Sequence, residues 1–333
     1  MKYLSESIGS DFLPFLSLCN YLQAHYFEAV IISNLPKYKR NILILPIEDS
    51  YKPTNIKKCN MKIFIFTLIF GLVNAQTHRF IYEFKFKQNP KQAEFKKENM
   101  TLDINPDNVK FYNYHYVTID STNITKGQNS QLWDTSTPVL LRSKNSNIYS
   151  NYLLINDVFV FDTEDEINWK LENDTKKFEN YTLQKATANF GGRNWTAWFA
   201  KDINISEGPY KFRGLPGMIF QLYDDKNNFD FTLVKSFKLK NTYKTPFIES
   251  FYGQKPIKTT RENINKMLMD KYKDPYHETR EEFKKNPNTT FSINGVDIKS
   301  INQFKELTES RQRYIRENNN PIEIDKAVHY PER

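Results

Sequence analysis

The feature that most constrains the fold is a clear alternation along residues 78–87, HRFIYEFKFK. Phe80, Tyr82, Phe84 and Phe86 fall on one side of an extended chain, and Glu, Lys and Lys follow on the other. Successive side chains of a β-strand point to opposite faces of the sheet. This period of two therefore predicts a half-buried strand, with its aromatic face on a core and its charged face in water.

Later segments repeat this character. Residues 111–119, FYNYHYVTI, alternate through Tyr112, Tyr114 and Tyr116 and predict a second strand. We expect further strands at 148–155, 158–161, around Trp169, and at 181–188, 195–200, 218–223 and 229–240. Turn signals such as Asn156-Asp157 and Gly191-Gly192 separate them, and no helical period is visible between them. Short connections favour an antiparallel meander over a parallel α/β sheet.

The pattern changes after Tyr243. Residues 260–285 carry apolar side chains at helical spacing, interrupted at Pro275, and predict a helix packed by one face. Residues 301–315 predict another short helix, and the polar tail from Asn318 is expected to be extended. The predicted fold is mainly β (α+β), a curved antiparallel sheet with C-terminal helices packed against it. A half-barrel is one form that such a sheet can take, by analogy at the level of the fold.

Residues 61–76, MKIFIFTLIFGLVNAQ, have the plan of a secretory signal peptide. A Lys follows Met61, an apolar run reaches Val73, and Val73 and Ala75 stand three and one residues before Gln76. The run is too short for an ordinary transmembrane helix, which needs about 20 apolar residues. A buried strand or short helix is the alternative. The pattern predicts a start at Met61, cleavage before Gln76, and a secreted or periplasmic product with no transmembrane span.

Four regions follow from these patterns. Residues 1–60 are expected to be a mis-annotated, poorly ordered extension, and residues 61–75 the signal peptide. Residues 76–243 form the β-rich domain, and residues 244–333 form a helical extension with a polar tail.

Composition excludes several classes of protein. Both cysteines, Cys19 and Cys59, precede Met61, so a chain that begins at Gln76 has no disulfide, thiolate metal site or cysteine nucleophile. The formal net charge is +8, but the charges are mixed along the chain, and nucleic-acid binding is not expected without a concentrated basic face. The histidines show no metal-binding spacing, and no cofactor fingerprint is present. We expect no metal and no cofactor.

Two longer blocks stand out, QKATANFGGRNWTAWF at 184–199 and GPYKFRGLPGMIF at 208–220. Gly191-Gly192 permits a tight turn with positive φ. In Leu215-Pro216-Gly217-Met218 the order of Pro and Gly matches a type II turn. Both blocks therefore read as strand–turn–strand units.

The two blocks resemble the signature of the GLPGLI family, a Porphyromonas-type conserved family. The resemblance runs from about His78 to the tail, where NNNPIEIDKAV also looks typical, and Met218 stands where Leu is commoner. It implies a secreted or envelope protein of a Gram-negative bacterium. It implies no established activity.

The candidate binding residues come from these blocks: Gly191, Gly192, Arg193, Trp195, Trp198, Gly214, Leu215, Pro216 and Gly217. Arg193 could clamp a carboxylate with its planar fork. The plainer interpretation is an arginine that stacks on a neighbouring Trp or pairs with Asp202 or Glu207. The two tryptophans could line an apolar groove, with Trp195 the better candidate for the core, and residues 214–217 could form a gating loop or a structural turn.

Two functional hypotheses are of different classes. The first is a non-enzymatic envelope protein that binds an apolar or protein ligand, with a sizeable cavity near Trp198 and the 214–217 loop. The second is a secreted hydrolase in which Arg193, Asp202 and Glu207 converge. A purely structural role in surface assembly is a third possibility, and the sequence sets no oligomeric state.

Overall fold

A computed structural model describes residues 76–131, 135–245, 255–286, 290–293 and 295–332. All of them belong to the second of two compact units of the chain, Phe70–Arg333. The predicted extension, the signal peptide and both cysteines lie outside the described residues.

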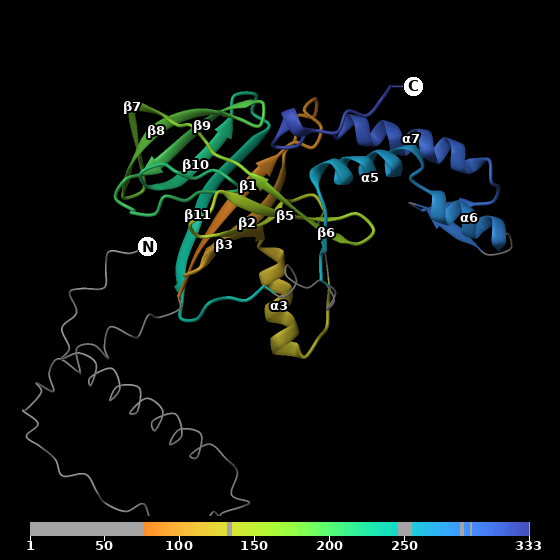
Figure 1. Cartoon of the computed structure of the whole chain (residues 1–333), viewed down its shortest axis with the longest axis horizontal. Helices are drawn as coiled ribbons and strands as arrows, with labels where there is room; N and C mark the ends of the chain where they lie inside the picture. Colours follow the sequence, from red (N-terminus) through yellow and green to blue (C-terminus); the bar gives the residue numbers. More distant parts are fainter. Residues whose placement is uncertain (1–75, 132–134, 246–254, 287–289, 294, 333) are drawn as a thin grey trace, which may run out of the picture. The chain divides into compact units, whose positions relative to one another are not determined.

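A large open sheet of twelve strands dominates the described residues (Figure 1). Its strands are β1 (Thr77–Phe86), β2 (Lys96–Ile104), β3 (Asn108–Asn113), β4 (Val139–Ser143), β5 (Ile148–Leu154), β6 (Val158–Glu164), β7 (Lys170–Phe178), β8 (Tyr181–Phe190), β9 (Arg193–Ala200), β10 (Met218–Asp224), β11 (Phe229–Leu239) and β12 (Ile257–Lys258). The spatial order is β12-β6-β5-β4-β3-β2-β1-β11-β10-β9-β8-β7. Neighbours are antiparallel except β12, which runs parallel to β6. The predicted mainly β fold is confirmed, as a mixed sheet that does not close.

Two meanders make up this sheet. Strands β1 to β6 follow one another in space, and so do β7 to β11. The pairing of β1 with β11 joins the two, with Tyr82 opposite Leu233 and Phe84 opposite Phe231. Among the described strands, the two meanders are therefore joined only by this pairing at the centre of the sheet.

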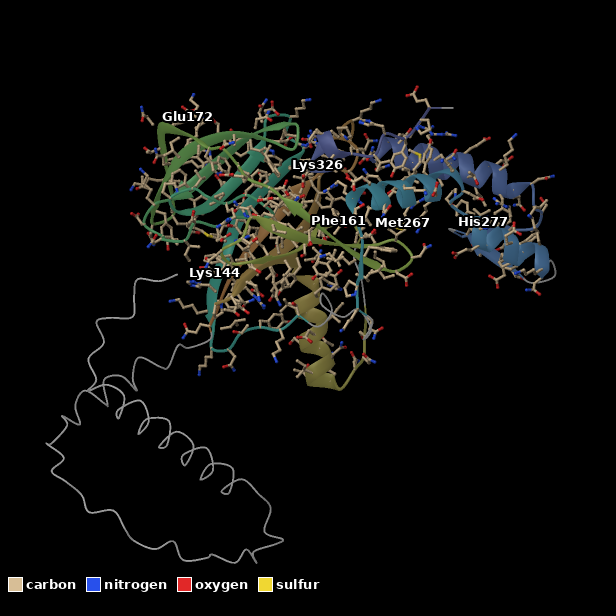
Figure 2. The ribbon with its side chains drawn as sticks, viewed as in Figure 1. Lys144, Phe161, Glu172, Met267, His277 and Lys326 are labelled. Atoms are coloured by element: carbon tan, nitrogen blue, oxygen red, sulfur yellow. The ribbon has the colours of Figure 1, made fainter. Side chains whose placement is uncertain are left out.

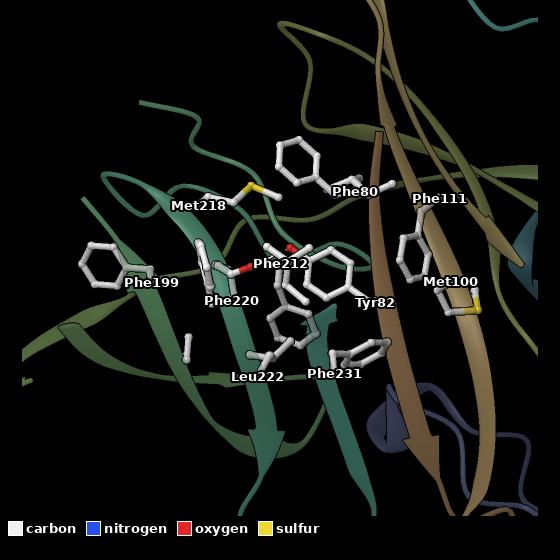
Figure 3. Close-up of a cluster of buried hydrophobic side chains, with 14 of the residues drawn as sticks. Phe80, Tyr82, Met100, Phe111, Phe199, Phe212, Met218, Phe220, Leu222 and Phe231 are labelled. Atoms are coloured by element: carbon white, nitrogen blue, oxygen red, sulfur yellow. Dashed lines mark hydrogen bonds between the residues drawn. The ribbon is translucent and has the colours of Figure 1, made fainter. Parts of the chain in front are cut away.

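The core lies on the face of the sheet that the alternating aromatics of β1 present (Figure 3). Phe80, Tyr82, Phe84 and Phe86 are all at most 4% exposed, which confirms their predicted face. Phe84 stacks on Phe231 with ring centroids 4.2 Å apart. Buried side chains of the segment between β9 and β10, Phe212 among them, pack onto the same cluster.

The opposite face of β1 is more exposed to solvent, but not at every residue. Glu83 and Lys85 are half-buried, whereas Arg79 is only 3% exposed and forms an ion pair of 2.6 Å with Asp103. Tyr112 donates its hydroxyl to the same carboxylate at 2.5 Å. A buried charge is tolerated when it is paired and hydrogen-bonded in this way.

The prediction of a strand over residues 111–119 is wrong beyond Asn113. Strand β3 ends there, and helix α3 (His115–Lys126) follows, so a helix does lie between strands. The Asn113 side chain accepts a hydrogen bond from the backbone N–H of His115, which turns the chain. Tyr112 and Tyr116 then bury together with Val139. Tyr112 comes from the end of β3 and Tyr116 from the first turn of α3, and the run of alternating aromatics conceals the change from strand to helix between them.

Strands β2 and β4 have no counterpart in the sequence prediction, and neither does the two-residue β12. The first half of β2, from Lys96, is exposed or half-exposed, and its buried half begins only at Met100. Such a strand shows no continuous alternation. Strands β1, β5 and β8 to β11 begin and end close to their predicted positions, whereas β6 continues to Glu164 and β7 begins only after Trp169.

Helices α5 (Arg261–Lys273) and α6 (His277–Lys285) flank Pro275, and α7 (Gln303–Glu317) follows a small hairpin of β13 (Phe291–Ile293) and β14 (Val296–Ile298). The Thr260 side chain caps α5 by accepting from the N–H of Asn263. Figure 1 shows α5 and α7 side by side, and the two helices are in contact. Phe283, Ile298 and Phe304 form a separate small core there.

The tail differs from its prediction. It contains a 3-10 turn, η1 (Ile324–Lys326), and both Ile322 and Glu323 are buried. It packs on the β-rich part of the chain, although the predicted division at residue 243 itself stays a prediction.

Candidate functional site

The tight turn between β8 and β9 is a docking point for the tail. Gly191 and Gly192 have φ of 63° and 73°, as the predicted turn requires. The carbonyl of Gly191 accepts the N–H of Ile324 at 2.7 Å. A Cβ at Gly191 would lie 2.8 Å from the Cα of Glu323. Glycine is therefore needed here for the close approach of the tail as well as for φ.

Arg193 holds the same tail segment. Its Nε donates to the carbonyl of Ile322 at 3.0 Å, and its Nη2 donates to Asn320 and to the carbonyl of Pro321 at 2.6 and 2.9 Å. Its Nη1 pairs with Asp224 at 3.3 Å. Burial lowers the pKa of Arg193, and Asp224 partly offsets that effect. These contacts make Arg193 a clamp for the chain's own tail, and its acidic partner is neither Asp202 nor Glu207.

The two tryptophans occupy different settings on β9. Trp195 is 1% exposed in the core, and its Nε1 donates to the carbonyl of Phe190 at 3.0 Å. Trp198 is half-buried on the opposite face of the strand, with the Lys176 ammonium 4.3 Å from its ring centroid. The prediction that Trp195 belongs to the core is confirmed.

The loop at 214–217 is held by its own hydrogen bonds. The Ser206 hydroxyl donates to the carbonyl of Leu215 at 2.6 Å, and the N–H of Gly217 donates to the same carbonyl at 2.8 Å. Leu215 is 1% exposed, Pro216 is exposed, and a Cβ on Gly217 would lie 2.2 Å from the carbonyl oxygen of Ala200. Gly214 has open space around it. These contacts describe an anchored turn.

The residues of the hydrolase hypothesis have separate partners. Glu207 pairs with Arg142 at 2.5 Å and with Arg213 at 3.6 Å, whereas Arg193 pairs with Asp224. Asp202 is exposed on the turn after β9. No contact joins Arg193, Asp202 and Glu207 within the described ranges.

A cavity lies elsewhere, between the core face of the sheet, α5 and the tail. Its volume is about 410 Å³. Its apolar floor comes from Phe84, Phe86, Leu140, Phe161 and Phe229. The N-terminal half of α5 forms one wall, through Ile264 and Leu268 among others, and residues 318–323 of the tail form another. Figure 2 labels Phe161 on β6 and Lys326 in the tail, which both line it. Neither Trp198 nor the 214–217 loop does.

A cluster of four charged groups borders this cavity. The Lys211 ammonium is fully buried and contacts Asp165 and Glu323 at 2.7 Å each. Lys326 pairs with Asp165 at 2.7 Å and also with Glu323. Tyr210 donates its hydroxyl to Glu323. Two ammonium groups thus face two carboxylates, and the cluster is neutral as a whole.

The ion pairs of this cluster stabilise the charged forms of its members. Burial alone would raise the pKa of Asp165, but Lys211 and Lys326 outweigh it and lower that pKa to about 2. The pKa of Glu323 is lowered for the same reason. Burial opposes the charge of Lys326 too, but its pKa is raised by the two carboxylates. Burial and the Glu323 carboxylate raise the pKa of Tyr210 well above its ordinary range.

Arg261, the first residue of α5, is the exception among the charged groups that line the cavity. Its guanidinium lies over the ring of Phe161, with Cζ 4.8 Å from the ring centroid. Its Nε is buried and has no hydrogen-bond partner among the described residues. No ion pair to Arg261 is present among them either.

The sequence prediction missed this cavity because its parts come from β1, β4 to β6, α5 and the tail. The local signals were modest. The Thr260 cap places Arg261 at the start of α5, and the apolar Ile322 and Ile324 interrupt an otherwise polar tail. No local pattern indicates that these segments meet.

Two further properties hold for the described residues. No group of His, Cys, Asp and Glu side chains among them is arranged to hold a metal ion. None of the helices in the described ranges is long and apolar enough to cross a membrane.

Comparison with known proteins gives a family of unknown function and a distant structural likeness. The family described as "Protein of unknown function (Porph_ging)" matches residues 191–221, which hold the FGGRNW turn's glycines and the GLPGM loop. No curated protein matches the chain. Two structures of PNGF-II, in space groups C2 and P21, are similar at 14% identity and a TM-score of 0.42. Each comparison covers 58% of this chain and 33% of that one, so the chain spans about a third of the length of PNGF-II. What the comparisons show is likeness to a Porphyromonas-type family over this short stretch, and the GLPGLI name stays a prediction.

Proposed function

We propose that this protein is a binding protein that holds a small, mainly apolar ligand in the cavity between the sheet, α5 and the tail. The observation that carries the proposal is the cavity itself, about 410 Å³ over a floor of phenylalanines. Ligand sites in proteins commonly measure about 300–1,000 Å³ and are lined by aromatic side chains with a few polar groups. This cavity has the size and the lining of such a site.

Binding is favoured over catalysis by the state of the polar groups at the cavity. Glu323 has a lowered pKa and Lys326 a raised one, so both stay charged at neutral pH. A general acid or base works best with a pKa near the working pH. Glu323 is also occupied by Lys211, Lys326 and Tyr210. These groups support the shape of the tail rather than a proton transfer.

The proposal is tested with the neutral probe 1-octanol and isothermal titration calorimetry on the full chain. We expect saturable binding, and we expect Leu268→Trp to weaken it at least about ten-fold because the indole fills space at the α5 wall. Lys266→Trp is the matched control, since Lys266 is exposed on the same helix and does not line the cavity. Absence of octanol binding to the unmodified protein, or equal binding by Leu268→Trp, contradicts the proposal.

We also propose export, with cleavage before Gln76. The position of β1 supports it, because that strand begins at Thr77 and removal of the preceding residues leaves every described strand intact. The mass of the protein purified from its native host tests this proposal. A product that starts at Gln76 is expected, and a cytosolic product that retains residues 1–60 contradicts it.

A further inference from the structure

We propose that the ligand is an amphipathic monoanion, an organic carboxylate with an apolar body, and that Arg261 binds its carboxylate. The inference rests on the proposed function and adds the chemical class of the ligand. It begins from the charges that line the cavity, which are those of Arg261, Glu323 and Lys326.

The charge balance of the cavity leaves one positive charge in excess. Glu323 and Lys326 belong to the neutral cluster with Lys211 and Asp165, in which each carboxylate contacts both ammonium groups. Arg261 stands outside this cluster, with no ion pair or hydrogen bond from its guanidinium to the described residues. Arg261 is half-buried, and a single uncompensated cation beside an apolar floor fits a ligand with a single negative charge and an apolar body.

The geometry of Arg261 suits a carboxylate. The side chain lies over Phe161, 4.8 Å from the ring centroid, and this stacking restricts the plane of the guanidinium. A planar guanidinium held in place presents a fork of N–H donors that matches the two oxygens of a carboxylate. Arg261 is also the first residue of α5, where the partial positive charge of the helix terminus adds to the attraction for an anion.

The apolar floor then holds the body of the ligand. Phe161 belongs to both features, because it carries the stacked guanidinium and also lines the cavity. The aromatic floor continues from it to Phe84, Phe86 and Phe229. A ligand whose carboxylate meets Arg261 can therefore extend its hydrocarbon part over this surface.

The test compares octanoate with 1-octanol, which have the same chain length and differ in charge at pH 7.5. We expect the unmodified full chain to bind octanoate about ten-fold more tightly than octanol, a difference of about 1.4 kcal/mol. Arg261→Gln removes this preference by weakening octanoate about ten-fold while octanol binding is unchanged. Arg261→Lys keeps part of it, because a lysine retains the charge without the fork.

Lys266→Gln is the matched control, since it removes one positive charge from the exposed side of the same helix and leaves the preference intact. Octanol binding by each variant reports that its cavity is folded. Equal affinity of the unmodified protein for octanoate and octanol, or an undiminished preference in Arg261→Gln, overturns the inference and leaves the binding proposal standing. Failure of both probes to bind overturns the binding proposal and this inference with it.

Discussion

Lys211 shows how one side chain can connect distant parts of this chain. Its ammonium group is fully buried and contacts Asp165, which follows β6, and Glu323 in the tail. An unpaired charge at this depth would destabilise the fold by several kcal/mol, so the two carboxylates are what make the lysine tolerable. The tail in turn is held where Glu323 and Lys326 meet Asp165 and Lys211.

The pH dependence of stability follows from Asp165. Its pKa is lowered from 3.8 to about 2 in the folded protein, so the folded state favours the charged carboxylate. The resulting stabilisation, about 2 kcal/mol, is present above the ordinary pKa and is lost as the pH falls from about 4 towards 2. Urea unfolding as a function of pH should show Asp165→Asn approaching the wild type in that window. Asp157→Asn, on the exposed β5–β6 turn, is the control and should follow the wild-type profile. A constant gap between Asp165→Asn and the wild type down to pH 2 would contradict this assignment.

At the scale of elements, the β8–β9 turn and the tail form one structural unit. The turn offers the Gly191 carbonyl, and Arg193 at the start of β9 binds three consecutive residues, 320 to 322. The turn, which lies in the stretch that matches the family of unknown function, is thus in direct contact with the tail. Docking of the tail is a structural reason for the glycines of this turn.

Substitution of Gly191 should separate the contribution of tail docking to stability from the cost of a positive φ. Gly191→Ala places a Cβ 2.8 Å from the Cα of Glu323 at a φ of 63°. Gly127→Ala is the matched control, because Gly127 has a φ of 62° and nothing within 4 Å. Both variants lose about 1 kcal/mol to the positive φ, and Gly191→Ala should lose at least about 1 kcal/mol more through displacement of the tail. Urea unfolding measures the difference, and limited proteolysis should cut the tail of Gly191→Ala sooner. Equal losses in the two variants would show that the tail does not press on this turn.

The elements that could be predicted are those with a local signal. Strand β1 and the strands from β8 to β11 alternate or lie between clear turns, and the Thr260 cap marks the start of α5. Helix α3 was missed because the alternation of tyrosines in β3 continues through Tyr114 to Tyr116 in its first turn, and β2 because half of it is exposed. The importance of Arg193 could be anticipated, but its partners could not, since residues 320–322 are far away in sequence. The Thr260 cap could place Arg261 at the start of a helix but not in a site, because what distinguishes Arg261 is that its buried Nε has no hydrogen-bond partner among the described residues.

At the scale of the whole described unit, the two meanders depend on one pairing, that of β1 with β11, which we call the seam. The pairing of β1 with β11 shifts register between Ile81 and Tyr82, where Val234 of β11 has no opposite residue, and the pairing of β10 with β9 shifts between Ile219 and Gln221. The hydroxyl of Tyr82 reaches from β1 past β11 and donates to the carbonyl of Ile219 at 2.6 Å. Figure 3 shows Tyr82 among the aromatic side chains between the two meanders. One buried side chain therefore ties the strands on both sides of β11.

Removal of this hydroxyl should loosen the seam. Tyr82→Phe leaves the Ile219 carbonyl without this donor in a fully buried setting, and we expect a loss of about 1–2 kcal/mol in the free energy of unfolding. Tyr181→Phe is the control, since Tyr181 is a half-buried residue of β8 that packs its ring against Phe220, and it should change stability by much less. Urea unfolding of both variants measures the effect. Equal stability of Tyr82→Phe and the wild type would mean that the hydrogen bond across β11 does not stabilise the seam.

The strand order has a consequence for biosynthesis. Strand β1 is made first among the described strands, and its partner β11 emerges from the ribosome only after ten other elements of the sheet and its connections. Until then β1 is a strand of closely spaced aromatic residues with one open edge, which is the kind of edge that pairs with other chains. Aggregation of the nascent protein should therefore begin at this strand, and a chaperone that acts early would act there.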